Sequence, residues 1–375
     1  MKKILIFADT YTPGFMGGGP VVSISNLVDL IEDEFEILVC TRNHDFGQKT
    51  AYSGIENDVF TNVKHHQVIY LSTYNALSFV RVVRAFQPDF VYLNSFFSNT
   101  TQNVLWLNFL FWRKPLLVAP RGELLKNSLG IKRRKKSLYL CFFKILGLYK
   151  NLIFHSTDSI ETRSLGEIFS IDKSEIIEIP NVPKRFQADA IRKDSNELRV
   201  VFISRICTKK NLHFALKTLA NTTQAITFDI YGPLEDLTYW SKCQHIMKNL
   251  PKNVTVRYKG VLKGHDVFNT LRQYQVFLLP TLSENYGHII VEAMQAGLIP
   301  VISDQTPWVN LQENNAGWDI SLDNPGEYTT TLEMLANLDT EKFDQLSQAV
   351  IIYIDSYLES FNLRLAYTDF FNSIR

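Results

Sequence analysis

Two glutamates, Glu284 and Glu292, stand eight residues apart around a segment that reads as a loop entering a helix. The loop follows an apolar stretch, residues 276–280, that is typical of a buried strand. Asn285 is a candidate N-cap, and the sequence predicts a helix over 286–296. The first turn of such a helix presents unpaired backbone N–H groups and the positive end of the helix dipole. Together these favour binding of a phosphate group.

The predicted helix, with Gly297 as its C-cap, gives the two carboxylates different surroundings. Glu292 lies one to two turns into the helix, on the face shared with His288 and Ile289, where it can accept two hydrogen bonds from a vicinal diol such as a ribose. Glu284 precedes the helix and can face whatever group is attached to the phosphate. The arrangement suits a nucleotide-sugar. The alternative is an ordinary surface helix, because two glutamates at this spacing are common by chance.

The residues around both glutamates resemble a known donor site. Asn285-Tyr286-Gly287 stands at the turn, and residues 292–301 run as Glu-Ala-Met-Gln-Ala-Gly-Leu-Ile-Pro-Val into another apolar stretch. In this context the spacing resembles the E-x7-E motif of the retaining glycosyltransferase family 4, whose members have the GT-B fold. Thr306-Pro307-Trp308 and residues 315–318 continue the resemblance. It implies that the donor contacts Glu284, Asn285, Tyr286, Gly287, His288, Ile289 and Glu292.

Two cations, Arg205 and Lys210, follow the apolar stretch 198–203 and could converge on a diphosphate. Taken alone they read as ordinary surface cations in a loop. Beside the E-x7-E segment they resemble the family's Arg…Lys diphosphate pair, which makes them catalytic candidates together with Glu284. Asn211 stands where the family often has glycine, and asparagine tolerates a positive φ.

A glycine-rich loop, residues 14–19, separates the first apolar stretch from a predicted helix over 22–30. Glycines let a backbone approach an anionic ligand closely. A nicotinamide-dinucleotide fingerprint is excluded, because G-x-G-x-x-G would need glycine at Val22. The resemblance implies that Gly18 and Gly19 face the donor phosphate and the acceptor. The alternative is a turn that merely closes a strand–helix junction.

Arg121 and Asp9 are further candidates for contact with the acceptor or the donor, because each follows a predicted strand. For Arg121 the alternative is a structural ion pair with Glu123. Thr157 and Glu161 also match the family's pattern at a strand end, but such residues more often cap a helix than contact substrate.

No Asp-x-Asp pair occurs in the chain, so the sequence predicts no metal site and no cofactor. Arg205, Lys210 and the helix N-terminus would then stabilise the leaving group.

Short apolar stretches alternate with helical patterns throughout, which predicts parallel α/β sheets. The predicted strands are 4–8, 35–40, 67–70, 90–93, 116–119, 152–155, 198–203, 226–231, 254–258, 276–280 and 299–303. Pro180–Phe186 and the polar residues after it form the predicted hinge. We therefore expect an α/β protein of GT-B fold, with two Rossmann-like parallel-sheet domains facing each other across a cleft. The predicted domains are an acceptor-side domain over 1–182, a nucleotide-sugar domain over 183–355, and a terminal helix over 356–375 that packs back on the first domain.

The charge of the 375-residue chain is unevenly distributed. The net charge is +1, which argues against a dedicated nucleic-acid binder, but residues 1–185 carry 22 basic against 17 acidic residues. Eight basic and no acidic residues lie within 126–150, next to an apolar run over 138–148. One reading is contact with an anionic membrane, to which each cation contributes ~1 kcal/mol, joined by Phe109, Phe111 and Trp112. The other is a helix buried against the first sheet.

Four scattered cysteines favour a reducing cytoplasm, and no stretch approaches the ~20 apolar residues of a membrane-spanning helix. The resemblance implies transfer of a sugar from a nucleoside-diphosphate-sugar, with retention, to a saccharide or lipid-linked acceptor. The setting would be synthesis of a bacterial lipopolysaccharide O-antigen, capsule or exopolysaccharide, in the cytoplasm or on the inner face of the membrane. UDP is the favoured donor nucleotide and GDP the next, with Val261 bordering the base. The alternatives are a sugar-nucleotide 2-epimerase and a non-catalytic sugar-nucleotide-binding subunit.

Overall fold

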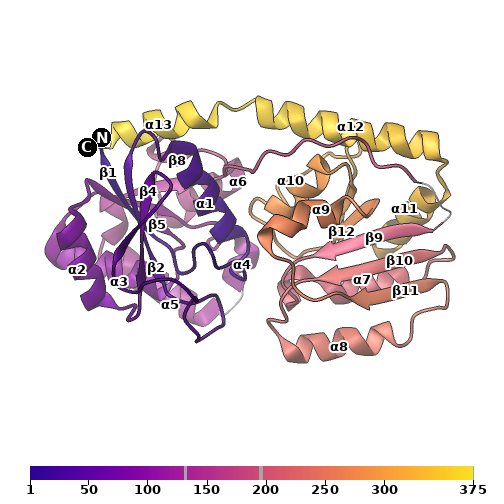
Figure 1. Ribbon diagram of the computed structural model, residues 1–375, viewed down its shortest axis with the longest axis horizontal. Coiled ribbons are helices and arrows are strands. Elements are labelled where there is room, and N and C mark those ends of the chain that lie inside the picture. The colour runs from indigo at the N-terminus through magenta and orange to yellow at the C-terminus, as the bar shows by residue number, and fades with distance from the viewer. Residues whose placement is uncertain (131–132, 194–196, 375) are drawn as a thin grey trace. The chain divides into compact units, whose positions relative to one another are not determined.

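The computed structural model describes residues 1–130, 133–193 and 197–374, without the side chains of residues 126, 127 and 133. The chain divides into two compact units (Figure 1). The first contains residues 1–182 and 362–375, and the second contains residues 183–361.

The first unit is built on an eight-stranded sheet in the order β3-β4-β2-β1-β5-β6-β7-β8. Neighbouring strands are parallel, except that β3 runs antiparallel to β4. The strands are β1 (Lys3–Phe7), β2 (Glu36–Arg42), β3 (Phe60–Val63), β4 (His66–Leu71), β5 (Phe90–Asn94), β6 (Leu116–Ala119), β7 (Leu152–Ser156) and β8 (Ile176–Glu178). The six predicted strands of this half are present, each within two residues of its predicted ends. Strands β3 and β8 are not predicted.

Alternate residues of each strand enter two separate cores on the two faces of this sheet. Leu5 and Leu38 lie in one core, with buried residues of α2 (Ala76–Phe86), α3 (Asn99–Leu107), α5 (Arg133–Ile145) and α6 (Ser159–Phe169). Ile4 and Ile37 lie in the other, with α1 (Gly19–Ile31) and α13 (Leu363–Ser373). Shorter helical segments complete the unit: α4 (Lys126–Gly130), η1 (Asn108–Trp112), η2 (Leu148–Asn151) and η3 (Lys173–Glu175).

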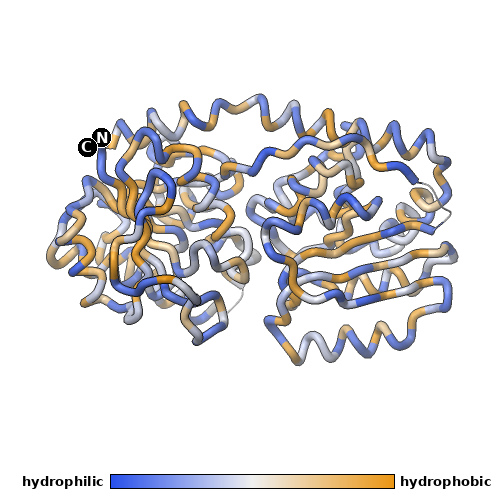
Figure 2. Tube along the Cα trace, viewed as in Figure 1, coloured by the Kyte–Doolittle hydropathy of each residue, from blue (hydrophilic) through white to orange (hydrophobic). Residues whose placement is uncertain are grey.

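The second unit is built on a six-stranded parallel sheet in the order β11-β10-β9-β12-β13-β14. Its strands are β9 (Leu198–Ile203), β10 (Ile226–Tyr231), β11 (Val254–Tyr258), β12 (Val276–Leu279), β13 (Ile299–Ser303) and β14 (Trp318–Ile320). The central strands are apolar over nearly their whole length, because helices cover both faces of a parallel sheet (Figure 2). The helices are α7 (Leu212–Leu219), α8 (Leu237–Met247), α9 (Val267–Leu271), α10 (His288–Gln295), α11 (Pro325–Asn337) and α12 (Thr340–Glu359), with the short turns η4 (Thr208–Lys210) and η5 (Gly264–Asp266).

The chain leaves the first unit between Val182 and Pro183 and returns to it between Phe361 and Asn362. The second crossing lies later than the boundary predicted after residue 355, because α12 continues to Glu359 and keeps Leu358 in the core of the second unit. Helix α13 then buries Phe370 and Phe371 in the first unit. Among the described residues, no helix combines the length and the hydrophobicity needed to cross a bilayer.

Candidate functional site

The loops that follow β9, β12 and β13 meet at the carboxyl edge of the second sheet. The Leu282 N–H donates to the Lys209 carbonyl at 2.8 Å, and the Glu284 N–H donates to the Gln305 carbonyl at 2.9 Å. These bonds join segments that are about 70 and 20 residues apart in the chain. They fix the segment that carries Glu284 against the segment that carries Lys209 and Lys210. Ligands of open α/β sheets bind at this edge.

Lys210 and Glu284 form an ion pair whose side chains are only 10% and 17% exposed. Burial alone would raise the pKa of Glu284, but the charge and hydrogen bond of Lys210, with smaller effects of the Lys209 charge and the Asn285 N–H, together lower it. The Glu284 carboxylate is therefore ionised at neutral pH. Two of the predicted catalytic residues thus lie in direct contact.

Lys209 is a second cation at this edge, and the sequence prediction does not include it. Burial lowers its pKa, and the neighbouring charge of Lys210 lowers it further. Lys209 lies beside Glu284 because a hydrogen bond joins two loops that are distant in the chain. A motif centred on Arg205 and Lys210 therefore does not indicate that Lys209 belongs to the site.

Helix α10 begins at His288, two residues later than predicted, and its N-cap is Gly287 rather than Asn285. Gly287 has a left-handed backbone (φ 76°), and a Cβ there would lie 2.8 Å from Ile290 Cδ1 and 3.1 Å from Glu284 Cγ. Glycine is the residue that adopts this conformation without strain. The helix ends at Gln295, one residue earlier than predicted, and its C-cap is Ala296; Gly297, the predicted C-cap, follows with φ 83°.

The start of α10 carries three of the predicted donor contacts, Tyr286, His288 and Ile289, whose side chains are buried to different degrees. Tyr286 is buried, its carbonyl accepts a 2.6 Å hydrogen bond from Trp308 Nε1, and its ring contacts that of His288 at 4.8 Å. Ile289 is half-buried against the core of the unit. The main chain of this turn is therefore held by packing of the aromatic side chains.

Glu292 is half-buried on α10. Burial raises the pKa of Glu292 to about 7, against the opposing charge of Lys184. Near neutral pH this carboxyl is therefore divided between its protonated and ionised forms.

Arg205 lies two residues beyond the end of β9, and its guanidinium pairs with the Glu235 carboxylate at 2.7 Å. About a third of each side chain is exposed. The backbone beside it is tightly packed, since a Cβ at Gly232 would meet the Ser204 carbonyl oxygen at 1.8 Å. Asn211 has φ 61°, which confirms the positive φ expected there. Val261, after β11, is 43% exposed.

In the first unit the glycine-rich loop leads from β1 into α1. Gly18 is the N-cap with φ 68°, and the helix begins at Gly19, three residues earlier than predicted, with Pro20 in its first turn. Proline fits the first turn because its missing N–H would have no helical acceptor. The carboxylate of Asp45 accepts hydrogen bonds from the N–H groups of Phe15 at 3.0 Å and Met16 at 3.2 Å. Asp45 holds the loop, and the sequence prediction does not include it.

Asp9 accepts a hydrogen bond from Thr100 Oγ1 and lies 3.6 Å from the guanidinium of Arg42. It therefore occupies the carboxyl edge of the first sheet, beyond β1, together with the last residue of β2 and a residue of the helix that follows β5.

Arg121 lies at the same edge, beyond β6, and its predicted alternative as an ion pair with Glu123 is wrong. Its guanidinium donates to Asn94 Oδ1 at 2.9 Å, to Tyr92 at 2.8 Å and to Asn181. Its backbone has a positive φ of 54°.

Glu123 instead accepts the N–H groups of Phe96 at 2.7 Å and Phe97 at 2.9 Å. The two side chains are neighbours in sequence, but the turn directs them to different partners.

Thr157 is not the cap of α6, and Glu161 lies in the first turn of that helix. Asp158 is the N-cap of α6, and buried Glu161 accepts the N–H groups of Thr157 at 3.0 Å and Gly122 at 2.5 Å. Glu161 therefore joins two loops of the first unit, and burial raises its pKa.

The second unit contains the match to a protein-family model. Residues 183–333 match the family model described as glycosyl transferases group 1. The GtfA subunit of a UDP-N-acetylglucosamine–peptide N-acetylglucosaminyltransferase from Streptococcus agalactiae is 26% identical over 136 residues, which are 34% of this chain and 26% of that protein. A GDP-mannose:cellobiosyl-diphosphopolyprenol alpha-mannosyltransferase from Xanthomonas campestris is 33% identical over 88 residues, or 23% of each chain. The chain thus spans about a quarter of the length of these curated relatives.

The similarity to solved structures extends over the whole chain. The Anabaena protein HepE, in complex with UDP-glucose, has a TM-score of 0.73 at 16% identity, covering 98% of this chain and 99% of that one. The predicted GT-B fold, with two parallel-sheet α/β domains, is confirmed. The family match and the fold together support a place for this chain in the superfamily of the group 1 glycosyltransferases.

Proposed function

We propose that the protein is a retaining hexosyltransferase that moves a sugar from a nucleoside-diphosphate-sugar to a saccharide or lipid-linked acceptor. The observation that carries the proposal is the buried Lys210–Glu284 pair, placed directly before the N-terminus of α10 with Glu292 further along the same helix. Lys210 and the helix N-terminus suit the diphosphate of a nucleotide-sugar, and the ionised Glu284 suits its sugar. Glu292 suits the ribose.

In this proposal each group of the second unit has one part of the donor. The first turn of α10 and Lys210, assisted by Arg205 and Lys209, holds the diphosphate without a metal ion. Glu292 accepts hydrogen bonds from the ribose hydroxyls, and Val261 borders the base.

Glu284 holds hydroxyls of the sugar and stabilises the positive character that develops at the anomeric carbon. In the first unit, Gly18 and Gly19 serve the donor phosphate and the acceptor, and Arg121 and Asp9 are assigned to the acceptor or the donor. Arg121 is suited to such a role because its positive φ is the kind of backbone strain that clusters at functional sites.

The proposed reaction takes place on one face of the sugar. The bond between the anomeric carbon and the departing phosphate oxygen breaks, and the acceptor hydroxyl oxygen forms the new bond on the same side. The acceptor proton passes to the departing phosphate oxygen, so no separate base is needed. Lys210 stabilises the negative charge that accumulates on the diphosphate.

We place this reaction in synthesis of a bacterial surface polysaccharide, on the cytoplasmic face of the membrane. One curated relative is named for a diphosphopolyprenol acceptor, and one structural neighbour is described as a glycosyltransferase involved in lipopolysaccharide biosynthesis. The cationic segment 126–150 supports the membrane side of the proposal. Of its eight cations, Lys132 and the side chains of Lys126 and Arg133 lie outside the described residues.

Glu292→Ala should weaken UDP or GDP binding by roughly 1–3 kcal/mol, because a charged hydrogen-bond partner of the ribose is lost. The wild-type affinity should rise with pH through about 7, since the pKa of Glu292 is about 7 and the ionised form accepts both hydroxyl hydrogens. Between pH 8 and pH 6 the affinity should fall by up to about tenfold, and Glu292→Gln should remove this dependence. Calorimetric titration measures both effects; an unchanged affinity in Glu292→Ala would contradict the ribose assignment.

Incubation with labelled nucleotide-sugars, with and without membrane extract, distinguishes the proposed activity from its alternatives. A transferase gives labelled glycan or glycolipid only when an acceptor is present. A 2-epimerase gives an isomeric nucleotide-sugar without an acceptor, and a binding subunit returns the donor unchanged. The epimerase would need a further set of acid and base groups, which the sequence does not reveal.

Thermal unfolding in the presence of UDP, GDP and other nucleotides would identify the base of the donor. A nucleotide present at 100 times its dissociation constant stabilises the folded protein by about 2.7 kcal/mol. We expect the largest shift with UDP and the next with GDP.

A further inference from the structure

Helix α5 exposes apolar side chains on the side that faces away from its core. Phe143 is 2% exposed within the first unit, whereas Leu138, Phe142 and Ile145 are 61%, 58% and 74% exposed. A helix on the surface of a soluble domain normally presents polar residues there. One face of α5 is therefore buried, as the first of the two alternatives drawn from the sequence expects, and the opposite face is apolar and exposed.

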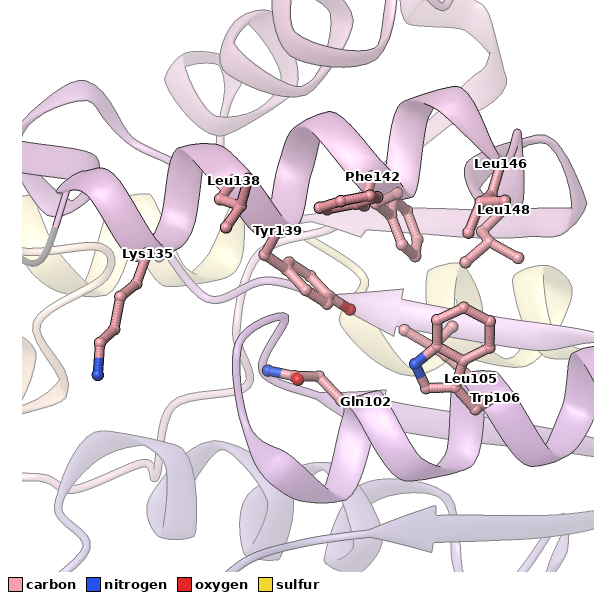
Figure 3. A pocket seen from close by; sticks show the side chains of 10 residues that line it. Gln102, Leu105, Trp106, Lys135, Leu138, Tyr139, Phe142, Leu146 and Leu148 are labelled. Atoms are coloured by element: carbon pink, nitrogen blue, oxygen red, sulfur yellow. The ribbon is translucent and has the colours of Figure 1, made fainter.

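A hollow of about 360 Å³ lies between α5 and α3 (Figure 3). Lys135 lies at one end, while Trp106 and Leu148 lie at the other. Its remaining lining is mainly aliphatic and aromatic. The hollow is in the size range of sites for small organic ligands, about 300–1,000 Å³. It is an apolar slot with a cation at one end.

The π-helical turn η1 extends this apolar surface. Phe109, Leu110 and Phe111 are 50%, 59% and 71% exposed, and the Phe109 ring contacts that of Trp106 at 6.3 Å. Trp106 also lines the hollow. We call the outward side of α5, the hollow and residues 109–111 the apolar face.

The segments that form the apolar face are rich in cations, and Lys135 lines its hollow. Between Asn99 and Lys150 the sequence has eleven basic residues and one acidic residue, Glu123. Among the described side chains, Arg134, Lys135, Lys144 and Lys150 are exposed. A second copy of this chain meeting the face by two-fold symmetry would place like charges opposite each other. The surface of an anionic bilayer has the complementary charge.

The length of the slot suits one chain of a membrane lipid. From Lys135 to Ile145, the last residue of α5, the helical rise of 1.5 Å per residue gives roughly 15 Å, and Leu146 follows directly. One leaflet of the hydrocarbon core, half of about 30 Å, has a similar thickness.

We propose that the apolar face docks on a bilayer of anionic phospholipid and that the hollow between α3 and α5 takes one lipid hydrocarbon chain, with Lys135 near its headgroup. This deepens the proposed membrane-side function, on which it rests, but its readout is lipid binding and does not depend on sugar transfer.

Trp106 reports directly on the hollow. We expect vesicles of phosphatidylglycerol with brominated acyl chains to quench the tryptophan fluorescence of the protein more than the same vesicles without bromine. Trp106→Phe should lose most of this difference while the protein still sediments with the vesicles. Equal quenching in Trp106→Phe, or sedimentation without chain-dependent quenching, would mean that no chain enters the hollow and would overturn the proposal.

Leu138→Glu tests the face itself. We expect at least a tenfold loss of sedimentation with phosphatidylglycerol vesicles, because the substitution places a negative charge beside the hollow. Leu77→Glu is the matched control, since Leu77 is 62% exposed on α2 of the same unit, and it should sediment as the wild type does.

Salt and lipid charge complete the test. Binding should decrease as salt rises and should be weak with phosphatidylcholine alone, since screening shortens the reach of the cations. Equal loss in both leucine variants, or equal binding to both lipids, would overturn the proposal. UDP affinity in each variant, measured separately, shows whether the fold and the nucleotide site are intact.

Discussion

Glu284→Gln should abolish sugar transfer while leaving the affinity for UDP or GDP nearly unchanged. Glutamine keeps the size of the side chain but removes the charge that, in our account, stabilises the anomeric carbon as the leaving group departs. In the wild type this charge is present at neutral pH, because Lys210 keeps the pKa of Glu284 low in spite of its burial. Initial rates with labelled donor, together with calorimetric titration of the nucleotide, measure the two properties separately.

The control is Glu341→Gln, an exposed carboxylate in the first turn of α12. It should transfer sugar as the wild type does. Because wild-type nucleotide affinity in Glu284→Gln demonstrates a folded second unit, loss of transfer in that variant would be chemical in origin. Near-normal turnover would remove Glu284 from the catalytic set.

Lys210→Ala should lower turnover by about 10²–10³, the usual effect of removing one group that stabilises developing negative charge. The effect should be larger than that of Arg205→Ala, because Lys210 is buried beside Glu284 whereas Arg205 is about a third exposed and paired with Glu235. A chelator such as EDTA should leave turnover unchanged, since these cations would take the place of a metal ion on the diphosphate.

Lys217→Ala is the matched control for the loss of one lysine, since Lys217 is exposed on α7 of the same unit. It should behave as the wild type does. Sensitivity to the chelator would contradict the metal-free mechanism, and a smaller effect for Lys210→Ala than for Arg205→Ala would contradict the assigned order of the two cations.

Strands β9, β10, β12 and β13 of the second sheet are predictable from the sequence because they are buried on both faces, and the partly exposed edge strand β11 is predicted as well. Residues 198–203, 226–231 and 254–258 match β9, β10 and β11 at both ends. The short edge strands β3, β8 and β14 are not predicted, since three or four residues of mixed polarity become strands only by pairing with a neighbour.

Positions within the loops are harder to predict than the elements they join. The start of α10 depends on the positive φ of Gly287 and not on the capping preference of Asn285. Lys209 and Asp45 act through contacts between segments far apart in the chain, so no local spacing indicates them. Arg121 and Glu123 are close in sequence, but the structure gives them different partners.

A crystal structure of the protein with UDP would test the central claim most directly. We predict the diphosphate within hydrogen-bond distance of Lys210 and of the N–H groups in the first turn of α10. The ribose hydroxyls should lie at about 2.6–3.2 Å from the Glu292 carboxylate. A nucleotide bound elsewhere, or bound at this edge with its ribose turned away from Glu292, would contradict the account.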